Sequence, residues 1–142
     1  EEVLQAGKSI VETPPLSVIE ALKALIDQYY DHSLVYLSKA MWRTAMAMSI
    51  QQPDSPFSKR YTELDCRLCG QVSTLVRKLQ LRGAIRPGVD AEAVDQMFFN
   101  NLNMMFMEFV KEEAMTLENL KQRVGRQNQP LATLIAGPVA GA

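Results

Sequence analysis

The segment from Ala91 to Ala114, AEAVDQMFFNNLNMMFMEFVKEEA, decides the fold class of this chain. Its apolar residues recur at helical spacing, and at about 100° per residue they cover roughly two-thirds of a helical wheel. They are Val94, Met97, Phe98, Phe99, Leu102, Met104, Met105, Phe106, Phe109 and Val110. A helix on the outside of a bundle needs a much narrower apolar stripe. The segment therefore predicts a helix buried on two sides, against its own domain and against a second surface.

The sequence on both sides of this segment also carries helix start and stop signals. Asp90 is an N-cap residue for it, and Gly83 suits the left-handed position that ends the preceding helix. That preceding helix starts at Ser55 and Pro56, after a loop over 51–56. Its apolar stripe is Tyr61, Leu64, Leu68, Val72, Leu75 and Leu79.

The two ends of the chain predict further helices. Residues 1 to about 12 read as a helix already under way, and Thr13 before two prolines is a cap for the next one. We expect a turn at about 31–33 and a further helix over roughly 34–49. Thr116 caps a last helix that carries Leu117, Leu120, Val124, Leu131 and Leu134, and that Gly125 and Pro130 should weaken or kink.

No segment alternates apolar and polar residues as a strand would, so the prediction is an all-α bundle of about five to six helices. Residues 1–142 form one domain in this interpretation, since the chain holds no repeat and no long linker.

Composition excludes several classes of function. The chain is 47% hydrophobic and has a net charge of −1, so it lacks the basic surface of a nucleic-acid-binding domain. No apolar run reaches the length of a membrane span, and no basic and apolar leader opens the sequence. Two cysteines cannot form a disulfide framework. We therefore expect a cytoplasmic protein that does not bind membranes, and binds no DNA through this chain alone.

Residues with catalytic potential are few and separated. His32 is the only histidine, and Cys66 and Cys69 lack the second ligand pair of a structural zinc site. Three glutamates near the end of the 91–114 segment, Glu108, Glu112 and Glu113, are explained by a solvated face. We expect no enzymatic activity, no metal and no cofactor.

Soft apolar side chains are the most distinctive feature of the composition. The chain has eight methionines, five phenylalanines, four tyrosines and one tryptophan. Because methionine is unbranched and polarizable, such residues line adaptable pockets well. Asn100, Asn101 and Asn103 lie among them, and the helical wheel puts Asn101 nearest the main apolar arc. A buried asparagine needs a hydrogen-bonding partner, so these features together favour a sizeable apolar cavity.

Residues 79–94, LQLRGAIRPGVDAEAV, resemble the junction of TetR-family effector domains, in which a long helix ends in a glycine turn and an aspartate caps the penultimate helix. The order and lengths of the helices resemble that family over nearly the whole chain. The N-terminal helix-turn-helix of the family is absent, and the chain starts where that unit would end.

The resemblance implies the C-terminal half of a transcriptional regulator. The last two helices, about 91–135, would pair with their copies in a homodimer, and the earlier helices would enclose a small-molecule effector. Residues 1–12 would connect to the absent DNA-binding head, through which alone the protein would reach DNA. An effector that prefers one arrangement of the domain would change the spacing of the two heads.

The apolar walls indicate a largely hydrophobic effector. We expect it to contact Tyr29, Tyr30, Ser33, Leu37, Met41, Trp42, Met46, Leu64, Leu68, Phe98, Asn101, Leu102 and Met105. We expect the dimer interface to contain Phe99, Phe106, Val110, Leu117, Leu120, Val124 and Leu131.

Two other interpretations stay open. One is a constitutive helical interaction module, in which the apolar arc binds a different protein and the core has no cavity. The other is an enzyme built on a helical bundle, which would need Cys66, His32 or the carboxylates to meet in a cleft.

Overall fold

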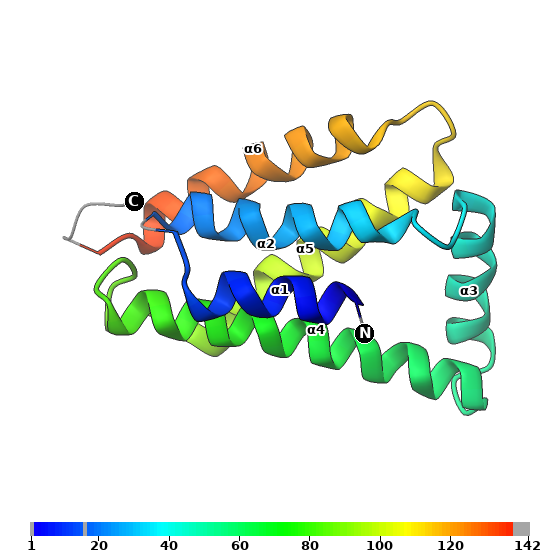
Figure 1. Ribbon diagram of the computed structural model, residues 1–142, viewed down its shortest axis with the longest axis horizontal. Coiled ribbons are helices and arrows are strands. Elements are labelled where there is room, and N and C mark those ends of the chain that lie inside the picture. The colour runs from blue at the N-terminus through cyan, green and yellow to red at the C-terminus, as the bar shows by residue number, and fades with distance from the viewer. Residues whose placement is uncertain (1, 16, 138–142) are drawn as a thin grey trace.

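The chain folds into six α-helices, as the computed structural model shows for residues 2–15 and 17–137 (Figure 1). They are α1 (Glu2–Glu12), α2 (Val18–Ser33), α3 (Lys39–Gln51), α4 (Pro56–Leu81), α5 (Ala91–Lys111) and α6 (Leu117–Ile135). Within these residues the only β pairing is one isolated bridge between Ile85 and Ala136. The predicted all-α class is confirmed. None of the helices in this part of the chain is both long enough and apolar enough to span a bilayer.

Three helices begin at the caps that the sequence predicted. The side chains of Ser55, Asp90 and Thr116 each accept a hydrogen bond from the backbone N–H three residues later. Thr116 also takes part in a reciprocal capping box with Asn119. α6 continues as one helix through Gly125 and Pro130, which were expected to weaken or kink it.

Two other helices begin later than predicted. The Thr13 hydroxyl donates to the Ser9 carbonyl, so Thr13 belongs to the end of α1, and Ser17 caps α2 instead. Similarly, α3 does not begin near Leu34, because the N–H of Val35 donates to the carbonyl of His32 and closes the end of α2. Ser38 caps α3, with its hydroxyl accepting from the N–H of Met41. In both places the cap is a serine that the sequence analysis did not identify.

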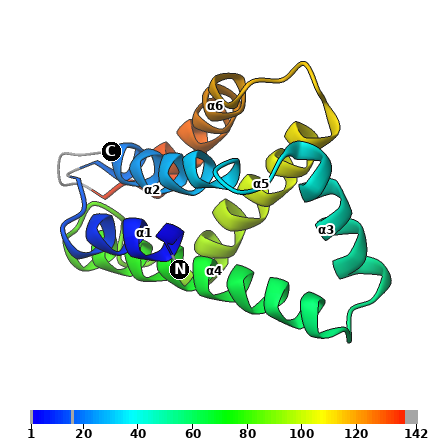
Figure 2. The same cartoon turned by 45° about the vertical axis from the view of Figure 1, so that its right-hand side comes forward.

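Five of the helices run alongside or across one another, and α3 stands apart. α1 lies between α2 and α4 in both views, and α6 packs against α2 and α5 (Figures 1 and 2). α3 spans the distance from the C-terminal end of α5 to the N-terminal end of α4, so these three helices form a triangle in Figure 2. The core lies among α2, α4, α5 and α6, and α3 contributes no fully buried residue to it. α3 therefore packs against the core from outside and is not part of it.

The turn between α4 and α5 is tied to the end of α6. Gly83 has φ of 86°, the left-handed conformation predicted for it. The N–H of Arg86 donates to the Ile135 carbonyl, and the N–H of Gly137 donates to the Ala84 carbonyl, both at 2.9 Å. A Cβ atom on Gly137 would lie 1.9 Å from the carbonyl oxygen of Gly83, so only glycine allows this approach.

Candidate ligand-binding cavity

A cavity of about 570 Å³ lies between α2, α3, α4 and α5. Small-molecule sites typically have volumes of about 300–1,000 Å³, so this cavity is large enough for a ligand of moderate size. The cavity is partly open to solvent. The cavity is closed on one side by α3, through Trp42, Ala45, Met46, Ser49 and Ile50.

Aromatic side chains form much of the wall. They are Tyr29, Tyr30, Tyr36, Trp42, Phe57, Tyr61 and Phe106. The ring of Trp42 packs edge-on against Phe106 and Tyr61, with centroid distances of 5.1 and 6.4 Å. Its indole N–H donates to the carbonyl of Ser33 at the end of α2. These contacts hold the one helix without buried residues against the rest of the wall.

Two tyrosines reach from α2 to the helices behind the cavity. The hydroxyl of Tyr30 donates to the Leu102 carbonyl at 2.8 Å, and that of Tyr29 donates to Oε1 of Gln71 at 2.7 Å. Burial raises the pKa of both tyrosines far above the ordinary value. They remain protonated at any physiological pH and serve as neutral donors.

Gln71 connects the cavity wall to the first helix. Its amide oxygen accepts from Tyr29, and its amide nitrogen donates to the carbonyl of Leu4 in α1 at 2.6 Å. α1 is held to α4 a second time, because the ammonium of Lys78 donates to the Val11 carbonyl at 2.9 Å. The predicted connector helix is thus bonded to the helix that carries one wall of the cavity.

One carboxylate faces the cavity. Asp65 lies on α4, and it makes no hydrogen bond or ion pair with any residue that the structure describes. Burial raises the pKa of Asp65 from 3.8 to about 6. The carboxyl group is therefore ionised at neutral pH although it is poorly solvated.

Asp65→Asn is expected to stabilise the free protein by about 1–2 kcal/mol at pH 7.5, a figure reduced for the partial exposure of the group. The folded-state pKa lies above the unfolded one, so the folded protein binds the extra proton between about pH 4 and 6. Stability of the parent chain thus falls as the pH rises through that range, and the benefit of the substitution disappears below about pH 4. Thermal melts at pH 7.5 and pH 3.5 measure this. The control, Glu63→Gln on the exposed side of α4, should show no such pattern.

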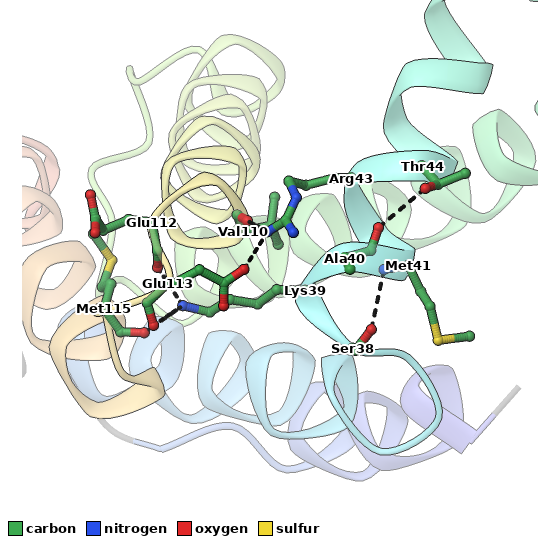
Figure 3. Close-up of polar contacts among 10 residues, drawn as sticks. All are labelled: Ser38, Lys39, Ala40, Met41, Arg43, Thr44, Val110, Glu112, Glu113 and Met115. Carbon is green, nitrogen blue, oxygen red and sulfur yellow. Dashed lines mark hydrogen bonds and ion pairs between the residues drawn. The ribbon is translucent and has the colours of Figure 1, made fainter.

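Two cations fasten α3 to the end of α5 (Figure 3). The ammonium of Lys39 donates to the carbonyls of Glu112 and Met115 at 2.5 and 2.6 Å, and lies 4.1 Å from the ring centroid of Phe109. Arg43 donates to the carbonyl of Val110 at 2.6 Å. Carbonyls at a helix C-terminus lack intrahelical partners and carry partial negative charge, which is why cations are stabilising there.

Lys39→Met is expected to loosen α3 and lower the free energy of unfolding by about 1–2 kcal/mol, because it removes the hydrogen bonds to the carbonyls of Glu112 and Met115 and the contact with the Phe109 ring. Amide hydrogen exchange should become faster in α3 than elsewhere. Lys59→Met, which removes the same charge from the exposed surface of α4, is the control. Equal exchange in α3 for both variants would contradict the anchoring role.

Most of the predicted ligand-contacting residues line the cavity. They are Tyr29, Tyr30, Ser33, Leu37, Trp42, Met46, Leu64, Leu68 and Leu102. Met41, Phe98, Asn101 and Met105 do not, and that part of the expectation is corrected. Met41 is exposed on the far side of α3, and Phe98 and Met105 are buried in the core. The cavity-facing positions of α5 are instead Leu102, Asn103, Phe106 and Met107.

Several lining residues were not among those predicted. They include Tyr36, Phe57, Arg60, Tyr61, Asp65 and Asn103. Tyr61 and Leu64 had been recognised as part of the α4 stripe, and Asp65 directly follows Leu64 on that face. The spacing of Phe57, Tyr61, Asp65 and Leu68 at three and four residues is the signal that could have identified the carboxylate.

The expected interface residues are mostly internal to the chain. Phe99, Phe106, Val110, Leu120 and Val124 are buried in the single chain, and Leu117 and Leu131 are partly buried. The five buried residues hold α5 and α6 to the domain, so they leave no surface for a partner. The expectation is corrected for them.

A different set of residues forms the outer face of α5 and α6. Met97 and Met104 on α5 are 55% and 52% exposed, and Leu134 on α6 is 68% exposed. Asn101, between the methionines, donates from Nδ2 to Oε1 of Gln127 at 2.9 Å and so joins the two helices at this surface. Positions 97, 101 and 104 and positions 127, 131 and 134 follow the same helical spacing. We call these six residues the α5–α6 outer face.

The remaining chemistry of the described residues is limited. No group of three or more His, Cys, Asp or Glu side chains among them could hold a metal ion. Burial, and then the charge of Asp95, raises the pKa of the Cys69 thiol, which disfavours the nucleophilic thiolate.

Comparison of the chain with protein-family models, curated proteins and solved structures gives no match. The resemblance to TetR-family effector domains therefore depends on residues 79–94 and on the order of the helices.

Proposed function

We propose that this chain is the effector-sensing and dimerisation domain of a TetR-type transcriptional regulator, and that a largely hydrophobic small molecule binds in the cavity between α2 and α5. The cavity itself carries the proposal. The cavity is partly open to solvent, and its largely apolar lining stays exposed while it is empty. A small molecule that fills about 570 Å³ would bury this lining, which is why we favour a ligand site.

The contacts of Gln71 support a route from the cavity to a DNA-binding head. A ligand that moves Tyr29 changes the hydrogen bond to Oε1 of Gln71, and the same amide holds Leu4 of α1. A head attached before α1 would respond to that change. The ligand must bind one arrangement of the domain more tightly than the other, since equal affinity for both would not shift the equilibrium between them.

The α5–α6 outer face supports the proposed homodimer. Met97, Met104 and Leu134 are exposed on two adjacent helices and form the kind of adaptable apolar surface that a second copy can cover. In a two-fold dimer the same face would be used by both subunits, and the four helices would form a bundle.

The test is native mass spectrometry of the purified chain, followed by thermal melts with a panel of apolar small molecules. We expect a dimer that retains or gains small-molecule mass, with stability rising as ligand is added. Ala45→Phe, which places a ring in the cavity, should abolish the ligand response, and Ala47→Phe on the exposed side of α3 should preserve it. A monomer that responds to no ligand would overturn the proposal and favour the interaction module.

A further inference from the structure

The charge distribution in the cavity identifies a class of ligand. Among the described residues that line the cavity, Asp65 is the only acidic one. It stands on the same face of α4 as Phe57, Tyr61, Leu64 and Leu68, so it is surrounded along that helix by apolar and aromatic side chains. Burial raises its pKa to about 6, which leaves it charged at neutral pH.

No cation of the described chain neutralises Asp65. Arg60 also lines the cavity, but its side chain is exposed, and it forms no ion pair with Asp65. Lys39 and Arg43, the cations of α3, are bonded to the end of α5. The ring nitrogen Nδ1 of His32 is 2.9 Å from the carbonyl oxygen of Gln28, within its own helix. A poorly solvated carboxylate without a partner is unfavourable, and a ligand that brings positive charge would relieve it.

Aromatic rings in the wall of the cavity favour a cation as well. Tyr61 lies one helical turn before Asp65, and its ring is 6.3 Å from Phe57 and 6.4 Å from Trp42, measured between centroids. Faces of aromatic rings attract ammonium groups, most strongly when the site is shielded from water. The three rings, the carboxylate and leucines 64, 68 and 102 all line the same cavity.

We propose that the cavity takes a lipophilic cation, either a protonated amine or a quaternary ammonium, with its charged group beside Asp65 and its apolar body along α4 and α5. This inference depends on the proposed function only in that the cavity binds a ligand. A carboxylate-bearing ligand would place like charge against Asp65, and a neutral ligand would leave the carboxylate without a partner.

Three probes that share an apolar chain and differ in charge separate the effect of the charge on binding from that of the chain. They are decyltrimethylammonium, decan-1-ol and decanoate. Trp42 is the only tryptophan of the chain and lies in the cavity wall, so its fluorescence reports binding at this site. We expect decyltrimethylammonium to bind about tenfold or more tightly than decan-1-ol, and decanoate to bind most weakly.

Substitutions at position 65 test the assigned counter-ion. Asp65→Asn should weaken the binding of decyltrimethylammonium by about tenfold and leave the binding of decan-1-ol unchanged. Asp65→Glu keeps the charge and should keep the preference for the cation. Glu63→Gln, on the exposed side of the same helix, should bind all three probes like the parent chain.

The outcomes separate this inference from the proposed function. If all three probes bind with the same affinity and Asp65→Asn changes none of these affinities, the cavity is a ligand site but the proposed preference for cations is wrong. Preferential binding of decanoate would likewise overturn the inference alone. If none of the probes alters Trp42 fluorescence at concentrations below micelle formation, both the inference and the ligand site are wrong.

Discussion

Phe109→Ala is expected to lower the free energy of unfolding by about 3–5 kcal/mol, the range for truncating a large buried aromatic side chain. Phe109 is only 1% exposed, and its ring lies 5.8 Å from that of Phe106, between centroids. The substitution leaves a void in the core and also removes the ring beneath the Lys39 ammonium. α3 should therefore lose part of its attachment in the same variant.

Urea denaturation followed by far-ultraviolet circular dichroism measures this loss. Phe57→Ala is the matched control, because that ring is 37% exposed and lies outside the buried core. We expect the control to lose about 1 kcal/mol. Similar losses in the two variants would contradict the assignment of Phe109 to the core. A double variant with Lys39→Met should lose less than the sum of the two, since both disturb one contact.

The paired substitution Met97→Glu and Met104→Glu is expected to convert the proposed dimer to a monomer, raising its dissociation constant by about a hundredfold or more. Each subunit would bring two carboxylates into the interface, where they lose hydration and repel the partner's copies. Both methionines are more than half exposed in the single chain, so the fold of each subunit should be retained.

Analytical ultracentrifugation across a range of protein concentrations measures the dissociation constant of the dimer directly. Leu81→Glu is the control, because Leu81 is the most exposed large apolar residue described, at 89%, and lies at the end of α4, outside the α5–α6 outer face. If the paired variant dimerises like the parent chain, another surface forms the interface. If Leu81→Glu alone separates the subunits, the assignment of the outer face is also wrong.

The local parts of the fold could be predicted from the sequence. A cap residue and the helix after it are separated by few residues, so Ser55, Asp90 and Thr116 were sufficient to mark three helix starts. Gly83 likewise identified its own turn. The cap of α2 was predicted at Thr13, but Ser17 provides it, because the Thr13 hydroxyl bonds to α1 and sequence spacing does not show which helix a hydroxyl faces.

Which side of each helix faces the cavity was predicted less well. α5 is apolar around most of its circumference, so periodicity could not tell core positions such as Phe98 from cavity positions such as Phe106. The same ambiguity placed Asn101 in the cavity, whereas Asn103 lines it. The partner helices of α5 decide these orientations, and they come from distant parts of the chain.

The α5–α6 hairpin is fastened at both of its ends. At one end the short connection holds a turn in which the N–H of Met115 donates to the Glu112 carbonyl, and the bridge between Ile85 and Ala136 closes the other end. Two helices joined only at their loop can move apart at the other end. Two helices joined at both ends move together, by translation or rotation. Leu102 and Phe106 line the cavity, and Met97 and Met104 lie on the opposite side of the same helix, so a ligand that shifts α5 would move both sets together. In the proposed dimer, binding of a ligand in the cavity would then change the angle between the two subunits.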